Sequence, residues 1–118
     1  MTAPVAFKLI DAAEWTAALE SGRYEGSAVD EADGYIHMST AAQLAETARR
    51  HYAGRASLML LAVKTDALGE ALLWEPSRGG DLFPHLYGAL PVTAVGAVRA
   101  LVVTDDGLMR FDDGGIAP

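Results

Sequence analysis

The chain has 118 residues, of which 51% are hydrophobic, and its sixteen acidic and nine basic side chains give a formal net charge of −7. This composition indicates one globular domain rather than a disordered chain, and the acidic balance disfavours non-specific binding to double-stranded nucleic acid or anionic lipid. A few focused cationic side chains can still hold a small anion. The absence of cysteine excludes disulfides, thiolate nucleophiles and cysteine-ligated metals.

The sequence carries no targeting or membrane-spanning pattern. Its first residues, MTAPVAFKLIDAAEW, lack a basic segment followed by a continuous apolar one. No window approaches the roughly 20 apolar residues of a membrane span. We therefore expect a cytoplasmic protein without membrane contact. We also expect a single domain core over residues 1–104, with a hairpin strand and a frayed tail over residues 105–118.

The first third of the chain predicts a strand and then a helix. Residues 5–10 are a β-capable run, and Asp11 with Glu14 predicts a capping box at the start of a helix that ends at Gly22. We expect residues 21–33 to form a polar loop.

A second strand and helix follow. Residues 35–38 predict a short strand, and Thr40 with Gln43 predicts a second capping box. The helix that follows has apolar residues at helical spacing and ends before Gly54. The continuous apolar run at 57–63 is typical of a central strand covered on both faces.

The C-terminal half predicts strands without helices. Residues 71–75 and 93–104 have strand composition, and Asp105-Asp106-Gly107 predicts a hairpin turn. The stretch 74–91 is too long for a tight hairpin and predicts a binding loop. This order indicates an α+β fold with two helices, both in the N-terminal half, and no glycine fingerprint of a doubly wound or P-loop fold is present.

Two segments carry groups suited to ligand binding. In DGYIHMST, a strand histidine, His37, precedes the hydroxyls of Ser39 and Thr40 at a helix start, where free N–H groups favour a ribose or phosphate oxygen. In a purely structural interpretation, the hydroxyls cap the helix and the histidine is hydrogen-bonded.

The second segment is WEPSRGGDLFPHLYGALP at 74–91. Glycines beside an arginine suit an anionic ligand. Alternatively, Arg78 pairs with Glu75 or Asp81 to fix the loop, and the aromatic residues pin it to the core. Its polar candidates are Glu75, Arg78, Asp81, His85 and Tyr87.

Other catalytic patterns are weak. No GxSxG motif surrounds a serine, and the histidines at 37, 51 and 85 have no short metal-ligand spacing. We therefore expect no metal.

The two segments together resemble an uncharacterised bacterial family of small single domains of unknown function, and the resemblance extends from Phe7 to Val103. That family is similar in fold to the ADP-ribosyltransferases. The resemblance implies two small, mostly antiparallel sheets around a cleft that binds NAD, flanked by two helices. Within that group, His37-Met38-Ser39 is similar to the second motif of the RNA 2′-phosphotransferases. The first-motif strand offers Lys8 where the group usually has histidine or arginine.

The resemblance implies an NAD- or nucleotide-binding protein, and an ADP-ribosyl-type transferase of unknown acceptor if it is an enzyme. His37 would contact nicotinamide or its ribose, and Glu75 would stabilise the reacting sugar. A small anionic nucleotide-like ligand would be the partner. A non-catalytic binding or sensing module that has lost transfer chemistry is the alternative, because the first-motif histidine is missing. The ligand-binding candidates are Lys8, Ser39, Thr40, Arg78, Asp81, His85 and Tyr87.

Overall fold

The largest element of the computed structural model, which describes residues 5–115, is a four-stranded antiparallel sheet. Its strand order is β1-β4-β8-β9, so the run predicted as a central strand does lie inside the sheet. The strands are β1 (Val5–Asp11), β4 (Leu58–Lys64), β8 (Val95–Val103) and β9 (Met109–Phe111).

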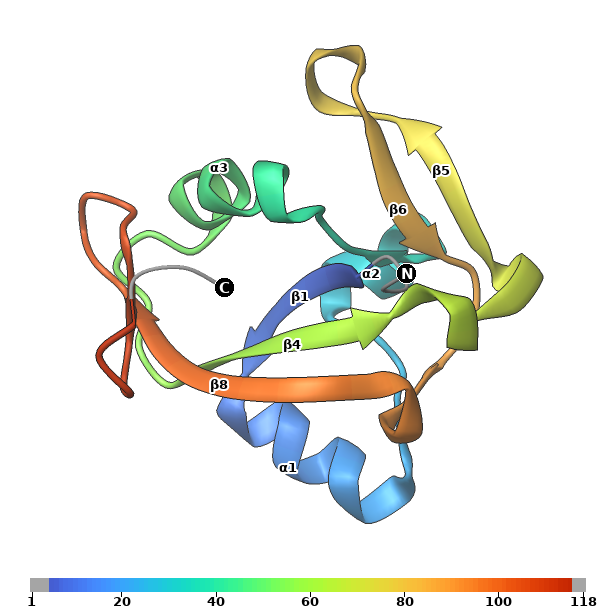
Figure 1. Ribbon diagram of the computed structural model, residues 1–118, viewed down its shortest axis with the longest axis horizontal. Coiled ribbons are helices and arrows are strands. Elements are labelled where there is room, and N and C mark those ends of the chain that lie inside the picture. The colour runs from blue at the N-terminus through green and yellow to red at the C-terminus, as the bar shows by residue number, and fades with distance from the viewer. Residues whose placement is uncertain (1–4, 116–118) are drawn as a thin grey trace.

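Two helices cover the opposite faces of this sheet. Figure 1 shows α1 (Ala12–Ser21) on one side and α3 (Ala41–His51) on the other. Side chains of β4 alternate between the two faces, as the pleat of a strand requires. Leu61 and Val63 join the cluster that contains Trp15 of α1, whereas Leu58 and Leu60 join the cluster that contains Leu44 of α3.

Two smaller antiparallel sheets complete the fold. One pairs β2 (Arg23–Tyr24) with β7 (Leu90–Pro91). The other has the order β3-β6-β5, formed by β3 (Ile36–His37), β6 (Leu82–Leu86) and β5 (Leu72–Pro76). The hairpin of β5 and β6 projects away from the large sheet (Figure 1). Short 3₁₀ turns span Thr65–Ala67, Gly69–Ala71, Arg78–Gly80 and Val92–Ala94.

The described residues therefore confirm the α+β class but correct its details. Residues 5–115 contain three antiparallel sheets and three α-helices, where two sheets and two helices were predicted. None of these helices is long and apolar enough to cross a membrane. Residues 116–118 of the predicted tail lie outside the described part of the chain.

The additional helix is α2 (Ala28–Asp33), which falls in the segment predicted as a polar loop. Its capping box is complete: the Ser27 hydroxyl accepts from the Asp30 N–H at 3.2 Å, and the Asp30 carboxylate accepts from the Ser27 N–H at 2.9 Å. Six residues are too few to show a helical apolar period, so only this cap spacing marks the helix in the sequence.

The two predicted capping boxes have different outcomes. The one formed by Thr40 and Gln43 is confirmed, with both reciprocal hydrogen bonds. The one at Asp11 is wrong, since its side chain caps nothing and instead forms an ion pair with Arg55.

The predicted loop at 74–91 is also wrong, because most of it is strand. β5 and β6 form a tight hairpin, closed where the Ser77 N–H donates to the Asp81 carbonyl at 2.9 Å. Proline is rare in a central strand, so Pro84 argues in the sequence against the strand that β6 in fact forms.

The three-stranded sheet β3-β6-β5 is attached to the edge of the four-stranded sheet through β1. Phe7 and Ser39 exchange two backbone hydrogen bonds, at 2.7 and 2.9 Å. The Met38 N–H donates to the Pro84 carbonyl at 3.0 Å, which continues the pairing toward β6. The segment after β3 is thus held between both sheets, and it brings its side chains to the edge of β1.

Gly26 allows the close approach that places Asp30. Its φ is +108°, and a Cβ there would lie 2.9 Å from the Asp30 Cβ. We predict that Gly26→Ala lowers the free energy of unfolding by about 1–3 kcal/mol through overpacking, beyond any backbone strain. The control is Gly22→Ala, with φ +90° and open space around the added Cβ. Urea denaturation of both variants tests this, and equal losses would contradict it.

Candidate functional site

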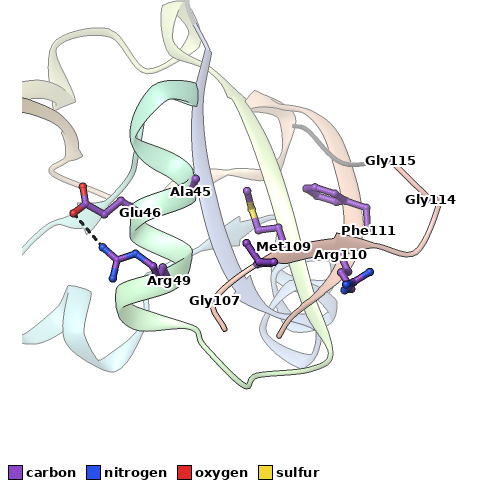
Figure 2. Close-up of a pocket in the computed structure, with 10 residues that line it drawn as sticks. Ala45, Glu46, Arg49, Gly107, Met109, Arg110, Phe111, Gly114 and Gly115 are labelled. Atoms are coloured by element: carbon purple, nitrogen blue, oxygen red, sulfur yellow. Dashed lines mark hydrogen bonds and ion pairs between the residues drawn. The ribbon is translucent and has the colours of Figure 1, made fainter. Parts of the chain in front are cut away.

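Two of the cavities among the described residues differ in the chemistry of their linings. The first, of about 700 Å³, is bounded by α3 and by the β8–β9 hairpin with the residues that follow it (Figure 2). Glu46 is the single carboxylate of this lining, and it pairs with the exposed Arg49 and Arg50. The second, of about 800 Å³, contains Lys8, Asp30, His37, Ser39 and His85. Because its lining holds buried titratable side chains, Lys8, Asp30 and His85, we take the second cavity, called the β1 cavity below, as the candidate site.

The β1 cavity follows the edge of strand β1. At one end Ser39 pairs with Phe7, and further along the Tyr52 hydroxyl donates to the Leu9 carbonyl at 2.9 Å. At the other end Arg55 pairs with Asp11. Four residue steps of a strand span about 13 Å, so the cavity suits an elongated ligand.

A buried ion pair forms one wall of the cavity. Lys8 of β1 places its Nζ 3.0 Å from Oδ2 and 3.2 Å from Oδ1 of Asp30 in α2. The two side chains are only 6% and 2% exposed. Removing either partner would leave a buried charge without compensation.

Burial and ion pairing shift the pKa of each of these two groups in opposite directions. Burial opposes ionisation of Asp30, but the hydrogen bond from His37 and the charge of Lys8 outweigh it and hold the Asp30 pKa well below its usual range. Burial lowers the pKa of Lys8, and the charge of Asp30 offsets only part of that effect. The Asp30 carboxylate therefore stays ionised at neutral pH.

His37 connects this pair to the mouth of the cavity. Its Nδ1 lies 2.6 Å from the Asp30 Oδ1, and its Nε2 lies 2.9 Å from the Asp33 Oδ2. Its backbone N–H also donates to Asp30, at 3.1 Å. Both ring contacts are hydrogen bonds only when both nitrogens carry a proton, because carboxylates only accept. The ring is about a third exposed, at 34%.

Four aromatic rings are in contact beside the cavity. Tyr35 stacks on His85, with ring centroids 4.1 Å apart and planes at 23°. Its ring centroid also lies 4.6 Å from that of His37 and 5.1 Å from that of Tyr87. These contacts hold the two imidazoles in fixed orientations.

Glu75 lies behind His85, and the described lining of the cavity does not include it. Its Oε1 is 2.8 Å from the His85 Nδ1, and it accepts from the Tyr87 hydroxyl at 2.7 Å. The hydrogen bonds from Tyr87 and His85 lower the Glu75 pKa, and the first of them raises the Tyr87 pKa to about 12. Tyr87 and His85 are thus the described partners of Glu75, and the predicted pairing with Arg78 falls on a side chain outside the described part of the structure.

The hydroxyls predicted at the start of α3 have separate roles. Ser39 is buried, lines the cavity, and places its Oγ 2.8 Å from the Thr47 Oγ1. Thr40 caps α3 with its hydroxyl, which accepts from the Gln43 N–H at 3.2 Å.

Four of the predicted ligand-binding residues, Thr40, Arg78, Asp81 and Tyr87, are not placed on the described lining. Asp81 is exposed and absent from the described lining. Arg78 lies in the turn between β5 and β6, and its side chain is outside the described part of the structure. Of the predicted site residues, the structure gathers Lys8, His37, Ser39 and His85 at the cavity, with Glu75 and Tyr87 behind them.

Sequence reasoning missed three residues that hold this arrangement: Asp30, Asp33 and Tyr35. The first two lie in the undetected helix α2, where the Ser27-x-x-Asp30 spacing is the one local signal. Tyr35 belongs to the quoted DGYIHMST segment, but its stacking on His85 depends on pairing with a distant strand. Within residues 5–115, no group of three or more acidic or histidine side chains is placed to hold a metal ion.

Comparison with known proteins identifies the family. A family model described as a protein of unknown function (DUF952) matches residues 9–98. The chain belongs to the DUF952 family. This confirms the predicted resemblance to a family of unknown function. A comparison of the chain with curated proteins finds no match.

Two solved structures of protein CC0527 from Caulobacter crescentus are similar to this DUF952 chain. The X-ray crystal structure has 50% sequence identity and a TM-score of 0.85, covering 89% of this chain and 92% of that chain. The solution NMR structure has 50% identity and a TM-score of 0.77, covering 87% and 89%. These similarities support the fold and the family assignment, and they indicate no activity.

The buried carboxylate predicts a specific dependence of stability on acid pH. Because the folded Asp30 pKa lies below its unfolded value, its contribution is present above pH ~4 and is lost as the pH falls below that. Asp30→Asn keeps the shape but leaves Lys8 unpaired, so we predict a loss of roughly 3–5 kcal/mol at neutral pH.

Urea denaturation at several pH values between neutral and about pH 2 measures both effects. The difference in stability between wild type and Asp30→Asn should shrink as the pH falls. The exposed Asp66 provides the control, as Asp66→Asn. A difference that does not vary with pH would contradict the assignment.

Proposed function

We propose that this protein binds a small nucleotide-like anion, NAD or a relative of it, in the β1 cavity. The observation that carries the proposal is the distribution of groups along the cavity. Arg50 and Arg55 lie on its lining, and His37 and His85 lie near the Ser39 end. A volume of about 800 Å³ is within the usual range for small-molecule sites.

The arginines are suited to the phosphate groups of such a ligand. Arg50 pairs with Glu46 and Arg55 with Asp11, and the arginine side chains are 48% and 45% exposed. Exposed ion pairs contribute little free energy, so exchanging a carboxylate for a phosphate costs little. Guanidinium groups bind phosphate through paired N–H donors.

The opposite end is suited to a ribose or a planar base. His37, Ser39 and His85 offer donors and acceptors there, and His85 adds a ring face already stacked on Tyr35. The sheets and helices around this cavity are the basis on which we propose likeness to the ADP-ribosyltransferase fold, as the sequence resemblance implied.

If the bound ligand reacts, glycosidic-bond transfer is the reaction that we propose. Departure of nicotinamide leaves positive charge on the ribose, and preorganised negative charge stabilises it. In this proposal His37 orients the ligand, and the ionised Glu75 acts from behind His85.

One observation favours a second candidate, a binding or sensing module without turnover. Both ring nitrogens of His37 already contact carboxylates, and Lys8 is fully paired with Asp30. Such closed networks hold a cavity wall rigid and leave few groups free for chemistry. The two candidates share the ligand and differ in whether product forms.

Ligand binding is tested by thermal shift and amide chemical-shift mapping. We predict that NAD or ADP-ribose raises the melting temperature and perturbs residues of the β1 cavity, and that His37→Ala reduces the affinity at least tenfold while the fold is kept. Arg110→Ala, in the cavity of Figure 2, is the control and should bind normally.

Released nicotinamide then separates transferase from sensor. Binding with release supports transfer, and binding without release supports the sensing module. Absence of any shift with NAD, ADP-ribose, nicotinamide or phosphate would overturn the proposed function. Equal loss of binding in His37→Ala and Arg110→Ala would remove the β1 cavity from it.

A further inference from the structure

The imidazole of His85 holds one nitrogen that the described contacts do not use. Its Nδ1 lies 2.8 Å from the Glu75 Oε1. Its Nε2 has no hydrogen-bond partner among the described residues. The described part of the chain contains no buried side-chain nitrogen without a partner, so the Nε2 of this 3% exposed residue must reach open space. That space is the β1 cavity, which His85 lines.

We propose that His85 is the proton acceptor of the β1 cavity and that Glu75 is its positioning residue. This rests on the cavity being a ligand site, as proposed above, but not on the ligand being NAD. The proposal also names a substrate class. A proton acceptor at this place would take the proton of a hydroxyl group, either of water or of an acceptor molecule.

The Glu75 contact determines which nitrogen is basic. A carboxylate accepts but does not donate, so the Nδ1 of His85 carries the proton and the Nε2 keeps its lone pair. Tyr87 donates to the same Oε1, at 2.7 Å, which fixes the carboxylate in place. Together these hydrogen bonds lower the Glu75 pKa, so the anion persists at neutral pH.

The neighbouring strands fix the orientation of the ring. His85 pairs with His37 on one side and with Leu73 on the other, and Tyr35 stacks on its face. The titratable groups around it are Glu75 from β5, Tyr87 after β6, Tyr35 before β3, and His37 of β3. The ring centroids of His37 and His85 are 5.7 Å apart. Glu75 is the one carboxylate among these, so the imidazolium formed by protonation has a direct counter-charge.

The step is a proton transfer coupled to substitution. The O–H bond of the hydroxyl breaks, its proton moves to the His85 Nε2, and its electron pair remains on oxygen. That oxygen forms a bond to the sugar carbon as the leaving group departs with the pair of the broken glycosidic bond. Glu75 stabilises the imidazolium and takes no proton.

The tautomer is measured by NMR on the ligand-free protein with ¹⁵N-labelled histidine. We expect His85 to carry its proton on Nδ1 when neutral, with Nε2 unprotonated. Glu75→Gln keeps the size of the side chain but can present an amide N–H as well as an oxygen to Nδ1, so the preference of His85 for a proton on Nδ1 should weaken. Glu70→Gln, an exposed glutamate in a 3₁₀ turn, should leave it unchanged.

Diethyl pyrocarbonate, which acylates unprotonated imidazole nitrogen, gives a second readout. Mass spectrometry should find His85 modified while His37, with both nitrogens engaged, reacts at least tenfold more slowly. A proton on Nε2 of His85, an unreactive His85, or the same tautomer preference in both Gln variants would each overturn the proposal. Since no nucleotide is present, failure of nucleotide binding leaves these outcomes intact and overturns only the proposed function.

Discussion

The buried carboxylate of Asp30 is the constraint on which the rest of the site depends. It accepts from Lys8 of β1, from the ring and backbone of His37, and from the Ser27 N–H that starts α2. It therefore connects the edge of the four-stranded sheet to the three-stranded sheet that contains His37. Buried ion pairs seldom add net stability compared with well-packed apolar residues, so its contribution lies in fixing where the cavity walls stand.

Most of the fold was predictable because its elements are long or locally marked. The apolar run of β4, the Thr40 cap of α3 and the hairpin turn at Gly107 carry their own signals. The errors occur where tertiary contacts decide. Helix α2 is too short to show a period, and Asp11 forms an ion pair with Arg55, a partner distant in sequence, instead of capping α1.

The candidate site was predictable as a set of residues but not as a geometry. Residue type pointed to His37, Ser39 and His85, the family resemblance pointed to Lys8, and the structure brings all four to one cavity. Their order in space depends on the pairing of β3, β6 and β5, which no local pattern shows. Glu75 thus stands behind His85 instead of facing the cavity. Asp30 was not predicted as a site residue, because the sequence does not show that a carboxylate in a polar stretch is buried.

A double-mutant cycle between Lys8 and Asp30 tests the central claim most directly, with Lys8→Met, Asp30→Asn and the combined variant. Asn keeps one acceptor oxygen for the Ser27 N–H of the cap, and the lost hydrogen bonds from His37 are common to Asp30→Asn and the double variant, so they cancel in the cycle. The account predicts that the double variant loses less stability than the sum of the two single losses, with a coupling free energy of about 1–3 kcal/mol by urea denaturation. Additive losses in the double variant would show that the pair does not hold the two sheets together.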